Sequence, residues 1–304
     1  MINKIWFKGN IVHKKDATVP ILSPTAQFGL NVFEGVKGYW NGKDKELIIC
    51  ELDAHLSRLR DSCKLVGIQC QYSNNQIKTF ISDYVASESI KKDVYFRIVL
   101  FVDSNEACSN NSWFSSDPVH LMIAATIKER KNPKTITGAS ACTSSWTRID
   151  DLSMPPRVKA GANYFAGRYS HFEAKAGHYD LPILINKYGK VAEGAGSCIF
   201  IIKADNLITP SSSSSILESI TRKIVLKLSG SIGLKSEVRD LDRTEIYTAD
   251  EVFLCGTTAE LIPIISLDGI KISNGLVGQQ TKNILKSYLE YACLLYTSPS
   301  PRDS

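Results

Sequence analysis

Two runs of aliphatic and aromatic residues constrain the fold of the first half of the chain most strongly. The runs are Asp93–Val102 and Val119–Ala125, and both are far too short to cross a membrane as helices. Their composition predicts buried strands. Asp53–Val66 has leucines at helical spacing behind an aspartate cap, and Asn74–Ser89 repeats the helical pattern. Strands and helices mixed in this way predict an α+β domain.

Length and local composition predict two domains. A chain of 304 residues is long enough for two hydrophobic cores. The segment 128–138 contains a proline and several lysines and is the predicted linker. We expect a small α+β domain over 1–127 and a larger domain over 139–292. Further strands are predicted at Lys4–Phe7, Asn10–His13, Val32–Trp40, Glu46–Glu51, Leu181–Asn186, Ser197–Ile202 and Glu251–Cys255, and further helices at Ala162–Ala176, Ser215–Leu228 and Gln279–Tyr291.

Composition excludes several classes of protein. Hydrophobic residues make up 43% and charged residues 22% of the chain, which is typical of globular proteins and not of disordered ones. The net charge of +5 is modest and forms no broad basic stripe, so a nucleic-acid partner is not expected. No apolar run reaches membrane-spanning length. The eight cysteines are scattered without metal-ligand spacing, which predicts reduced thiols, no metal site and a cytoplasmic location.

Four short motifs supply a chemically coherent set of groups. Lys159 and Tyr164 lie in one segment, and Glu193-Gly-Ala-Gly196, Ser219-Ile-Thr-Arg222 and Gly256-Thr-Thr258 follow in that order. The first segment offers an amine and a phenol, the second a carboxylate, and the last two offer turns suited to a phosphate. Each group alone is more often structural than catalytic, since most lysines are solvated and such turns and caps are common. Their combination is what indicates a cofactor site.

Pyridoxal phosphate requires this set of groups. Its aldehyde is held as a Schiff base by a lysine amine, for which Lys159 is the candidate. Its ring withdraws electrons best when the ring nitrogen is protonated beside an acidic partner, for which Glu193 is the candidate. Its phosphate is suited to a helix N-terminus, where backbone N–H groups lack partners. Ser219–Arg222 offers such a start.

The order of these motifs resembles the class IV (fold type IV) pyridoxal phosphate aminotransferases, and most closely their branched-chain amino-acid members. Upstream, Val32–Tyr39, His55–Leu59 and Tyr95–Arg97 match the same family in the same order, so the resemblance covers nearly the whole chain. It implies a two-domain fold with the cofactor in the cleft between the domains, and a homodimer or larger homo-oligomer. The implied activity is transfer of an amino group between leucine, isoleucine or valine and 2-oxoglutarate, in two half-reactions.

The resemblance also implies a role for each site residue. Lys159 would be the Schiff-base lysine and proton shuttle, Glu193 the partner of the ring nitrogen, and Tyr164 the donor to the cofactor's phenolic oxygen. Leu217 would pack against the ring. The remaining implied roles are phosphate binding by Arg58, Ile220, Thr221, Gly256 and Thr257, and substrate binding by Phe33, Tyr95, Arg97, Thr258 and Ala259.

Several positions depart from the branched-chain pattern. The family usually has a tyrosine at the position of Phe28, an arginine at that of Lys37 and an asparagine at that of Cys198. Its members also carry a Pro-Trp-Gly segment where this chain has Thr126-Ile-Lys-Glu129. These changes leave the apolar substrate pocket less defined by the family pattern than the cofactor site.

Three alternatives remain open at this point. A D-amino-acid aminotransferase shares the fold, but typically has an arginine and a histidine in the loop where this chain has Val102–Cys108. An aminodeoxychorismate lyase uses the same lysine to eliminate pyruvate. A non-catalytic pyridoxal phosphate carrier would bind the cofactor without any half-reaction.

The final residues, 293–304, break the preceding helical pattern with a Ser/Pro-rich sequence. We interpret them as a non-native tail, comparable to a fusion scar, and leave them out of the fold prediction. A disordered native tail is the alternative.

Overall fold

The computed structural model describes residues 2–104, 116–128, 130 and 133–294. Contacts group the chain into an N-terminal unit, made of Met1–Arg130, Val158–Ala162 and Tyr291–Ser304, and a C-terminal unit, made of Lys131–Arg157 and Asn163–Glu290. The segment that carries Lys159 therefore groups with the N-terminal unit, although it lies within the range 139–292 predicted for the larger domain.

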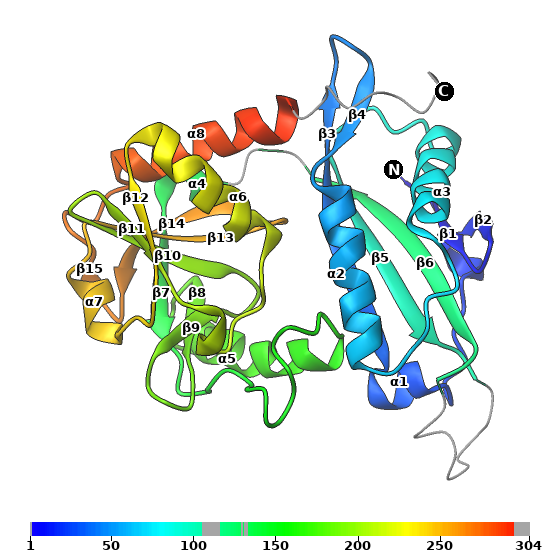
Figure 1. Cartoon of the computed structure of the whole chain (residues 1–304), viewed down its shortest axis with the longest axis horizontal. Coiled ribbons are helices and arrows are strands. Elements are labelled where there is room, and N and C mark those ends of the chain that lie inside the picture. Colours follow the sequence, from blue (N-terminus) through cyan, green and yellow to red (C-terminus); the bar gives the residue numbers. More distant parts are fainter. Residues whose placement is uncertain (1, 105–115, 129, 131–132, 295–304) are drawn as a thin grey trace. The chain divides into compact units, whose positions relative to one another are not determined.

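The N-terminal unit is built on a six-stranded sheet in the order β2-β1-β6-β5-β3-β4, and every neighbouring pair is antiparallel (Figure 1). The predicted α+β architecture is confirmed. The strands are β1 (Lys4–Phe7), β2 (Asn10–His13), β3 (Asn31–Asn41), β4 (Glu46–Ile49), β5 (Val94–Val102) and β6 (Val119–Ile127). The helices are η1 (Lys14–Asp16), α1 (Pro24–Phe28), α2 (Leu52–Leu65) and α3 (Asn74–Ser87).

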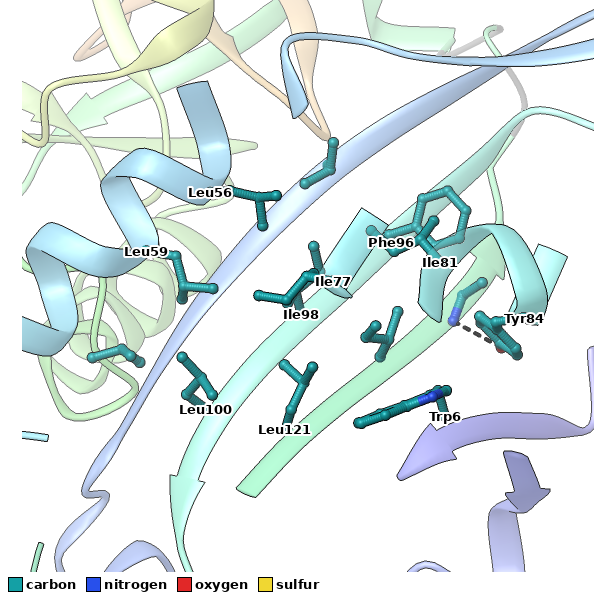
Figure 2. Packing of buried hydrophobic residues seen from close by; sticks show 14 of the residues in the cluster. Trp6, Leu56, Leu59, Ile77, Ile81, Tyr84, Phe96, Ile98, Leu100 and Leu121 are labelled. Carbon is teal, nitrogen blue, oxygen red and sulfur yellow. Dashed lines mark hydrogen bonds between the residues drawn. The ribbon is translucent and has the colours of Figure 1, made fainter. Parts of the chain in front are cut away.

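One face of this sheet forms the core of the N-terminal unit. Side chains alternate along a strand, and on β5 the alternate residues Phe96, Ile98 and Leu100 are fully buried. Helices α2 and α3 pack their apolar sides on this face (Figure 2). The Tyr84 hydroxyl accepts a hydrogen bond from the Ala125 amide at 3.2 Å, which satisfies the buried phenol. Each such aliphatic or aromatic side chain stabilises the fold by about 1.5–3 kcal/mol on burial.

The opposite face of the sheet carries three of the candidate site residues of this unit, Phe33, Tyr95 and Arg97. In the β3–β5 register, Phe33 lies opposite Val99, Gly35 opposite Arg97 and Lys37 opposite Tyr95. Because the side-chain period of a strand is two, these residues face away from the core formed with α2 and α3. Arg97 and Tyr95 are accordingly only partly buried.

The predicted aspartate cap of α2 is wrong. The helix begins at Leu52, and the N-cap is Glu51, in the left-handed region with φ 51° and without a side-chain cap bond. Asp53 lies in the first turn, where its charge still suits the positive end of the helix dipole. Helix α3 starts at a capping box, in which the Ser73 hydroxyl accepts from Gln76 N and the Gln76 side chain accepts from Ser73 N.

The C-terminal unit contains a nine-stranded sheet in the order β12-β11-β10-β13-β14-β7-β8-β9, with β15 paired to β14. The pairs β11/β12, β7/β14 and β7/β8 are parallel and the others antiparallel. The strands are β7 (Ala139–Thr143), β8 (Leu181–Ile185), β9 (Val191–Gly194), β10 (Cys198–Lys203), β11 (Asn206–Thr209), β12 (Lys235–Val238), β13 (Glu251–Gly256), β14 (Glu260–Leu267) and β15 (Ile270–Lys271). The helices are α4 (Pro133–Thr137), η2 (Ala162–Tyr164), α5 (Phe165–Ala176), η3 (Ser212–Ser214), α6 (Ile220–Ser229), η4 (Gly230–Ile232), α7 (Arg243–Tyr247) and α8 (Gln279–Leu294).

Helix α6 begins later than the sequence pattern predicted. Ser215 lies in the left-handed region with φ 67°, which ends the preceding 3-10 turn. The helix starts at Ile220 because the Ser219 hydroxyl accepts a hydrogen bond from Arg222 N at 3.2 Å and so caps the first turn. The five residues before Ile220 are therefore not part of the helix.

Some sequence-based expectations fall wholly or partly outside the described residues. These are the loop Val102–Cys108 beyond residue 104, residue 129 of the Thr126–Glu129 segment, residues 129, 131 and 132 of the predicted linker, and the predicted tail from residue 295. Cys293 and Leu294 are the last residues of α8. Within the part of the chain that is described, no helix combines the length and the apolar character needed to span a bilayer.

Candidate active site

The backbone of Lys159 is held from two sides within the N-terminal unit. Val158–Ala162 runs beside β3, where Phe33 N donates to Lys159 O at 2.9 Å and Gly161 N donates to Asn31 O at 3.2 Å. Lys159 N donates to the Ser62 hydroxyl of α2 at 3.1 Å. These bonds fix the start of a long, flexible side chain, so its amine can reach only a small region.

The Lys159 amine lies among aromatic and cationic groups. Its Nζ is 5.0 Å from the centre of the Phe33 ring, and the Arg97 guanidinium carbon is 4.3 Å from the same centre. Burial, aided by the charge of Arg58, lowers the pKa of Lys159 to about 8. About a tenth of the amine is then unprotonated at pH 7, against about one part in 2,500 for an ordinary lysine. Lys159 is thus able to act as a nucleophile near neutral pH.

Arg58 projects from α2 and is bound to a buried carboxylate. Its Nε donates to Glu34 Oε1 at 2.7 Å and its Nη2 to Glu34 Oε2 at 2.8 Å. His55 Nδ1 lies 2.7 Å from Glu34 Oε2. Burial raises the pKa of Glu34, but hydrogen bonds from Arg58 and His55 and the charge of Arg58 outweigh it and lower that pKa to about 2. A guanidinium held along one edge in this way keeps a fixed plane.

Gly35 leaves room for the Tyr95 phenol on the face of β3 that is turned away from α2 and α3. A Cβ atom built on Gly35 would overlap the Tyr95 hydroxyl, so any other residue here must displace that ring. The phenol and Arg97, which stacks on the Phe33 and Tyr95 rings, are thereby kept beside one another.

We expect Gly35→Ala to destabilise the protein by about 1–3 kcal/mol, the usual cost of overpacking. Gly42→Ala is the matched control, because its Cβ would meet only Trp40 Nε1 at 3.8 Å and its φ is not positive. Urea denaturation of the two variants measures the difference. Equal stabilities would contradict a steric role for Gly35.

Glu193 of β9 is the centre of a second group of residues, in the C-terminal unit. Its side chain is almost fully buried. Arg148 Nε donates to its Oε1 at 2.8 Å, and Leu217 N donates to the same oxygen at 3.2 Å. The Cys198 thiol lies 3.8 Å from Oε2. Ionic and polar donors therefore fix the position of this carboxylate, which suits it to face a cationic ring nitrogen.

Two glycines near Glu193 bring neighbouring segments close together. A Cβ on Gly196 would lie 3.9 Å from the Tyr164 ring, and one on Gly256 would lie 3.5 Å from Gly196 O. Tyr164, the turn after β9 and the end of β13 are thus adjacent. Thr257, Thr258 and Ala259 form the turn that leads from β13 to β14.

Helix α6 packs near β13, and its N-terminus offers donors for an anion. Ser219 caps Arg222 N, and as the first two residues of the helix Ile220 and Thr221 have no earlier carbonyl within the helix to bond. Arg222 is buried and donates to Thr209 Oγ1 at 3.1 Å and to Pro210 O at 2.8 Å. These bonds connect the first turn of α6 to the end of β11.

The cysteines near this group are buried thiols. Cys198 lies directly opposite Cys255 in the β10–β13 register. Burial raises the pKa of Cys255 well above its usual value, so its reactive thiolate is scarcely populated. None of the cysteines among the described residues is part of a disulfide bond.

The structure thus places the predicted site residues in two groups, one in each unit. The N-terminal unit holds Phe33, Arg58, Tyr95, Arg97 and Lys159 together. The C-terminal unit holds Tyr164, Glu193, Leu217, Ile220, Thr221, Gly256, Thr257, Thr258 and Ala259.

The sequence did not single out three contributors, Glu34, Ser62 and Arg148. Glu34 carried a usable signal, because it is a charged residue on the apolar side of a predicted strand. Arg148 and Ser62 carried none, since their partners lie 45 and 97 residues away.

Known proteins resemble this chain over nearly its whole length. Residues 31–267 match the family described as amino-transferase class IV. A probable branched-chain-amino-acid aminotransferase of Aquifex aeolicus is 35% identical over 285 residues, which are 93% of this chain and 90% of that protein. The branched-chain-amino-acid aminotransferase of Escherichia coli is 31% identical over 291 residues, 93% of this chain and 91% of that protein.

A solved structure of a branched-chain aminotransferase also matches the fold of this chain. The branched-chain amino acid aminotransferase of Thermobaculum terrenum in its PLP form has a TM-score of 0.87 and 35% identity, and the match covers 95% of this chain and 94% of that one. Both the sequence match and this fold match span the two groups of site residues.

Proposed function

Because this chain belongs to the class IV aminotransferase family and is an aminotransferase, we propose that it transfers an amino group between a branched-chain L-amino acid and 2-oxoglutarate, with pyridoxal 5'-phosphate as its cofactor. The observation that carries the proposal is Lys159, a fixed lysine with a pKa of about 8. The relatives named as branched-chain enzymes support the substrate class.

The residues present fit the proposed cofactor. When bound, it supplies an aldehyde carbon and an electron-withdrawing ring. The Lys159 amine suits the aldehyde, and the Glu193 carboxylate, held by Arg148, suits a protonated ring nitrogen. The first turn of α6 and the Gly256-Thr257 turn suit a phosphate, since their backbone N–H groups attract an anion.

Lys159 would also carry out the proton transfer of the reaction. Lys159 Nζ would be a base with a pKa of about 8, close to the working pH. It would take the proton from the substrate α-carbon and later release it. The short reach imposed by its fixed backbone keeps Nζ on one side of the reacting atoms, which favours transfer between them.

The substrate would be bound by groups with different chemistry. Phe33 offers an apolar surface for a leucine, isoleucine or valine side chain. Arg97 and Tyr95 offer donors for the distal carboxylate of 2-oxoglutarate or glutamate, and the planar guanidinium suits two-point binding. Backbone N–H groups at Thr258 and Ala259 would bind the α-carboxylate. One site could thereby accept an apolar and an acidic side chain in turn.

Spectroscopic half-reactions test the proposed function. The purified protein loaded with pyridoxal 5'-phosphate is mixed in turn with L-leucine, L-valine, L-glutamate, D-alanine and an aromatic amino acid. We expect loss of the visible cofactor absorbance with the branched-chain acids and with glutamate, and a matching yield of 2-oxo acid. Absorbance loss with D-alanine alone would overturn the substrate assignment, and release of pyruvate from aminodeoxychorismate without nitrogen transfer would indicate a lyase.

We also propose a homodimer in the cytoplasm. Trp146 and three residues at helical spacing on α5, Phe165, Tyr169 and Phe172, are between 40% and 59% exposed, and Trp146 stacks on Tyr169 with ring centres 4.6 Å apart. Exposed aromatic clusters of this kind are typical of protein interfaces. The cysteines of the described residues form no disulfide bonds, which supports a reducing compartment. Sedimentation equilibrium of the loaded protein measures the assembly, and a monomer would exclude the dimer.

A further inference from the structure

Glu34 is a carboxylate in a place where the sequence pattern calls for an apolar side chain. It lies on β3 between Val32 and Val36, which are both part of the apolar core, and its side chain has 0% exposure. Burial of a charge is strongly unfavourable unless the charge is paired. The position is therefore explained only by what Glu34 binds.

Its partners are two residues of one helix. Arg58 donates to both carboxylate oxygens, and His55, one turn earlier on α2, bonds to Oε2. Burial lowers the pKa of His55, so its imidazole is neutral at pH 7. A neutral His55 must then donate its Nδ1 proton, because an ionised Glu34 can only accept. Each oxygen of Glu34 thus has a donor, and His55 supports the carboxylate that holds Arg58.

The cluster is also close enough to Lys159 for their charges to interact. The negative charge of Glu34 raises the pKa of Lys159, and the positive charges of Arg58 and Arg97 lower it. Tyr95 also raises the pKa of this amine, and the charge of Lys159 in turn lowers the pKa of His55. Glu34 therefore opposes the accumulation of positive charge around the nucleophile.

We propose that Glu34 is a positioning residue, which fixes the guanidinium plane of Arg58 so that the N–H groups not directed at Glu34 bind the phosphate of the cofactor. This inference rests on the proposed function, in which Arg58 is one of the phosphate ligands. An arginine held in one rotamer loses less side-chain entropy when the anion binds. Loss of Glu34 would remove the two hydrogen bonds that hold this edge of the guanidinium.

The test compares binding of pyridoxal 5'-phosphate with binding of pyridoxal, which lacks the phosphate, in wild type and Glu34→Gln. Absorbance titration gives both dissociation constants. The dissociation constant of pyridoxal divided by that of pyridoxal 5'-phosphate measures the contribution of the phosphate. We expect this ratio to fall by about tenfold or more in Glu34→Gln, as for loss of a well-placed charged hydrogen bond, while pyridoxal binding changes little. An unchanged ratio would overturn the proposal.

Two further variants separate positioning from charge and from folding. Glu34→Asp keeps the charge but withdraws the carboxylate by one methylene, and we expect it to lose most of the phosphate preference as well. A double variant then combines Glu34→Gln with Arg58→Met. Its preference for pyridoxal 5'-phosphate over pyridoxal should be no lower than that of Arg58→Met alone, because Glu34 acts through Arg58. Additive losses, or a full preference in Glu34→Asp, would count against the inference.

A matched control removes another carboxylate that binds an arginine in the same unit. Asp93 accepts from Arg130 and from Trp40 N, and Asp93→Asn should leave the phosphate preference unchanged. Borohydride trapping of the cofactor distinguishes failure of the proposed function from failure of the inference about Glu34 alone. A wild-type chain with neither a trapped adduct nor a phosphate preference would overturn the proposed function and this inference together. Trapping with an unaffected Glu34→Gln ratio would overturn this inference alone.

Discussion

Lys159→Ala is expected to reduce transamination by about three orders of magnitude or more, as is usual for loss of a nucleophile on which the whole reaction depends. The variant should also lose the visible absorbance of the bound cofactor, since no other side chain would replace the amine at the aldehyde. The physical reason is the fixed backbone of Lys159, held by β3 and by Ser62. Absorbance spectroscopy and a coupled assay for 2-oxo acid measure the two effects.

Lys175→Ala is the control for Lys159→Ala. Lys175 is an exposed lysine on α5, and its loss should alter neither absorbance nor rate. Mass spectrometry after borohydride reduction then identifies the modified position. A cofactor adduct of full intensity in Lys159→Ala would refute the assignment of this lysine.

Glu193→Gln is expected to lower turnover by about 10²–10³-fold, the usual cost of losing one fixed electrostatic partner in an active site. Glutamine has nearly the same shape but cannot stabilise a protonated ring nitrogen as a carboxylate does. It would also leave the largely buried Arg148 guanidinium without its anion, which further disfavours a positive ring. The cofactor should still bind, because the phosphate and aldehyde contacts remain.

The measurement for Glu193→Gln is single-turnover kinetics with a saturating amino acid, together with a titration of the cofactor absorbance with pH. Glu173→Gln is a suitable control, since Glu173 is a carboxylate of the same unit that bonds only to Ser144 and Ser145 in its described contacts. A normal turnover in Glu193→Gln would show that the ring nitrogen is stabilised by another group.

Elements with a strong local pattern were predictable from the sequence. The apolar run of β5 and the leucine spacing of α2 gave both elements within one or two residues, because burial decides such segments. Strand β9 was not predicted, although it carries Glu193. It has four residues, of which one is charged, and its extended form depends on pairing with β8. Short strands of this kind are decided by tertiary contacts rather than by composition.

The candidate site also has some residues that the sequence predicts and others that only the fold reveals. The order of the motifs and the family resemblance predict which residues would contact the cofactor, and those contacts stay predictions. The groups that hold those residues in place were not identified, apart from the weak signal at Glu34. Arg148 is an arginine among many until the fold brings it to Glu193, and the same is true of Ser62 beside Lys159. Supporting contacts depend on the register of strands and on helix packing, which a single sequence does not specify.

The short stretch Val158–Ala162 has a consequence for any attempt to divide the protein. It supplies Val158 and Ala160 to the core of the first unit, and its backbone bonds to Asn31 and Phe33. A truncated fragment that stops at residue 130 would therefore leave polar groups on that edge of β3 without partners and two gaps among packed side chains, both of which favour aggregation. The first 130 residues are in this sense an incomplete folding unit, and their independent expression requires the later stretch to be grafted back.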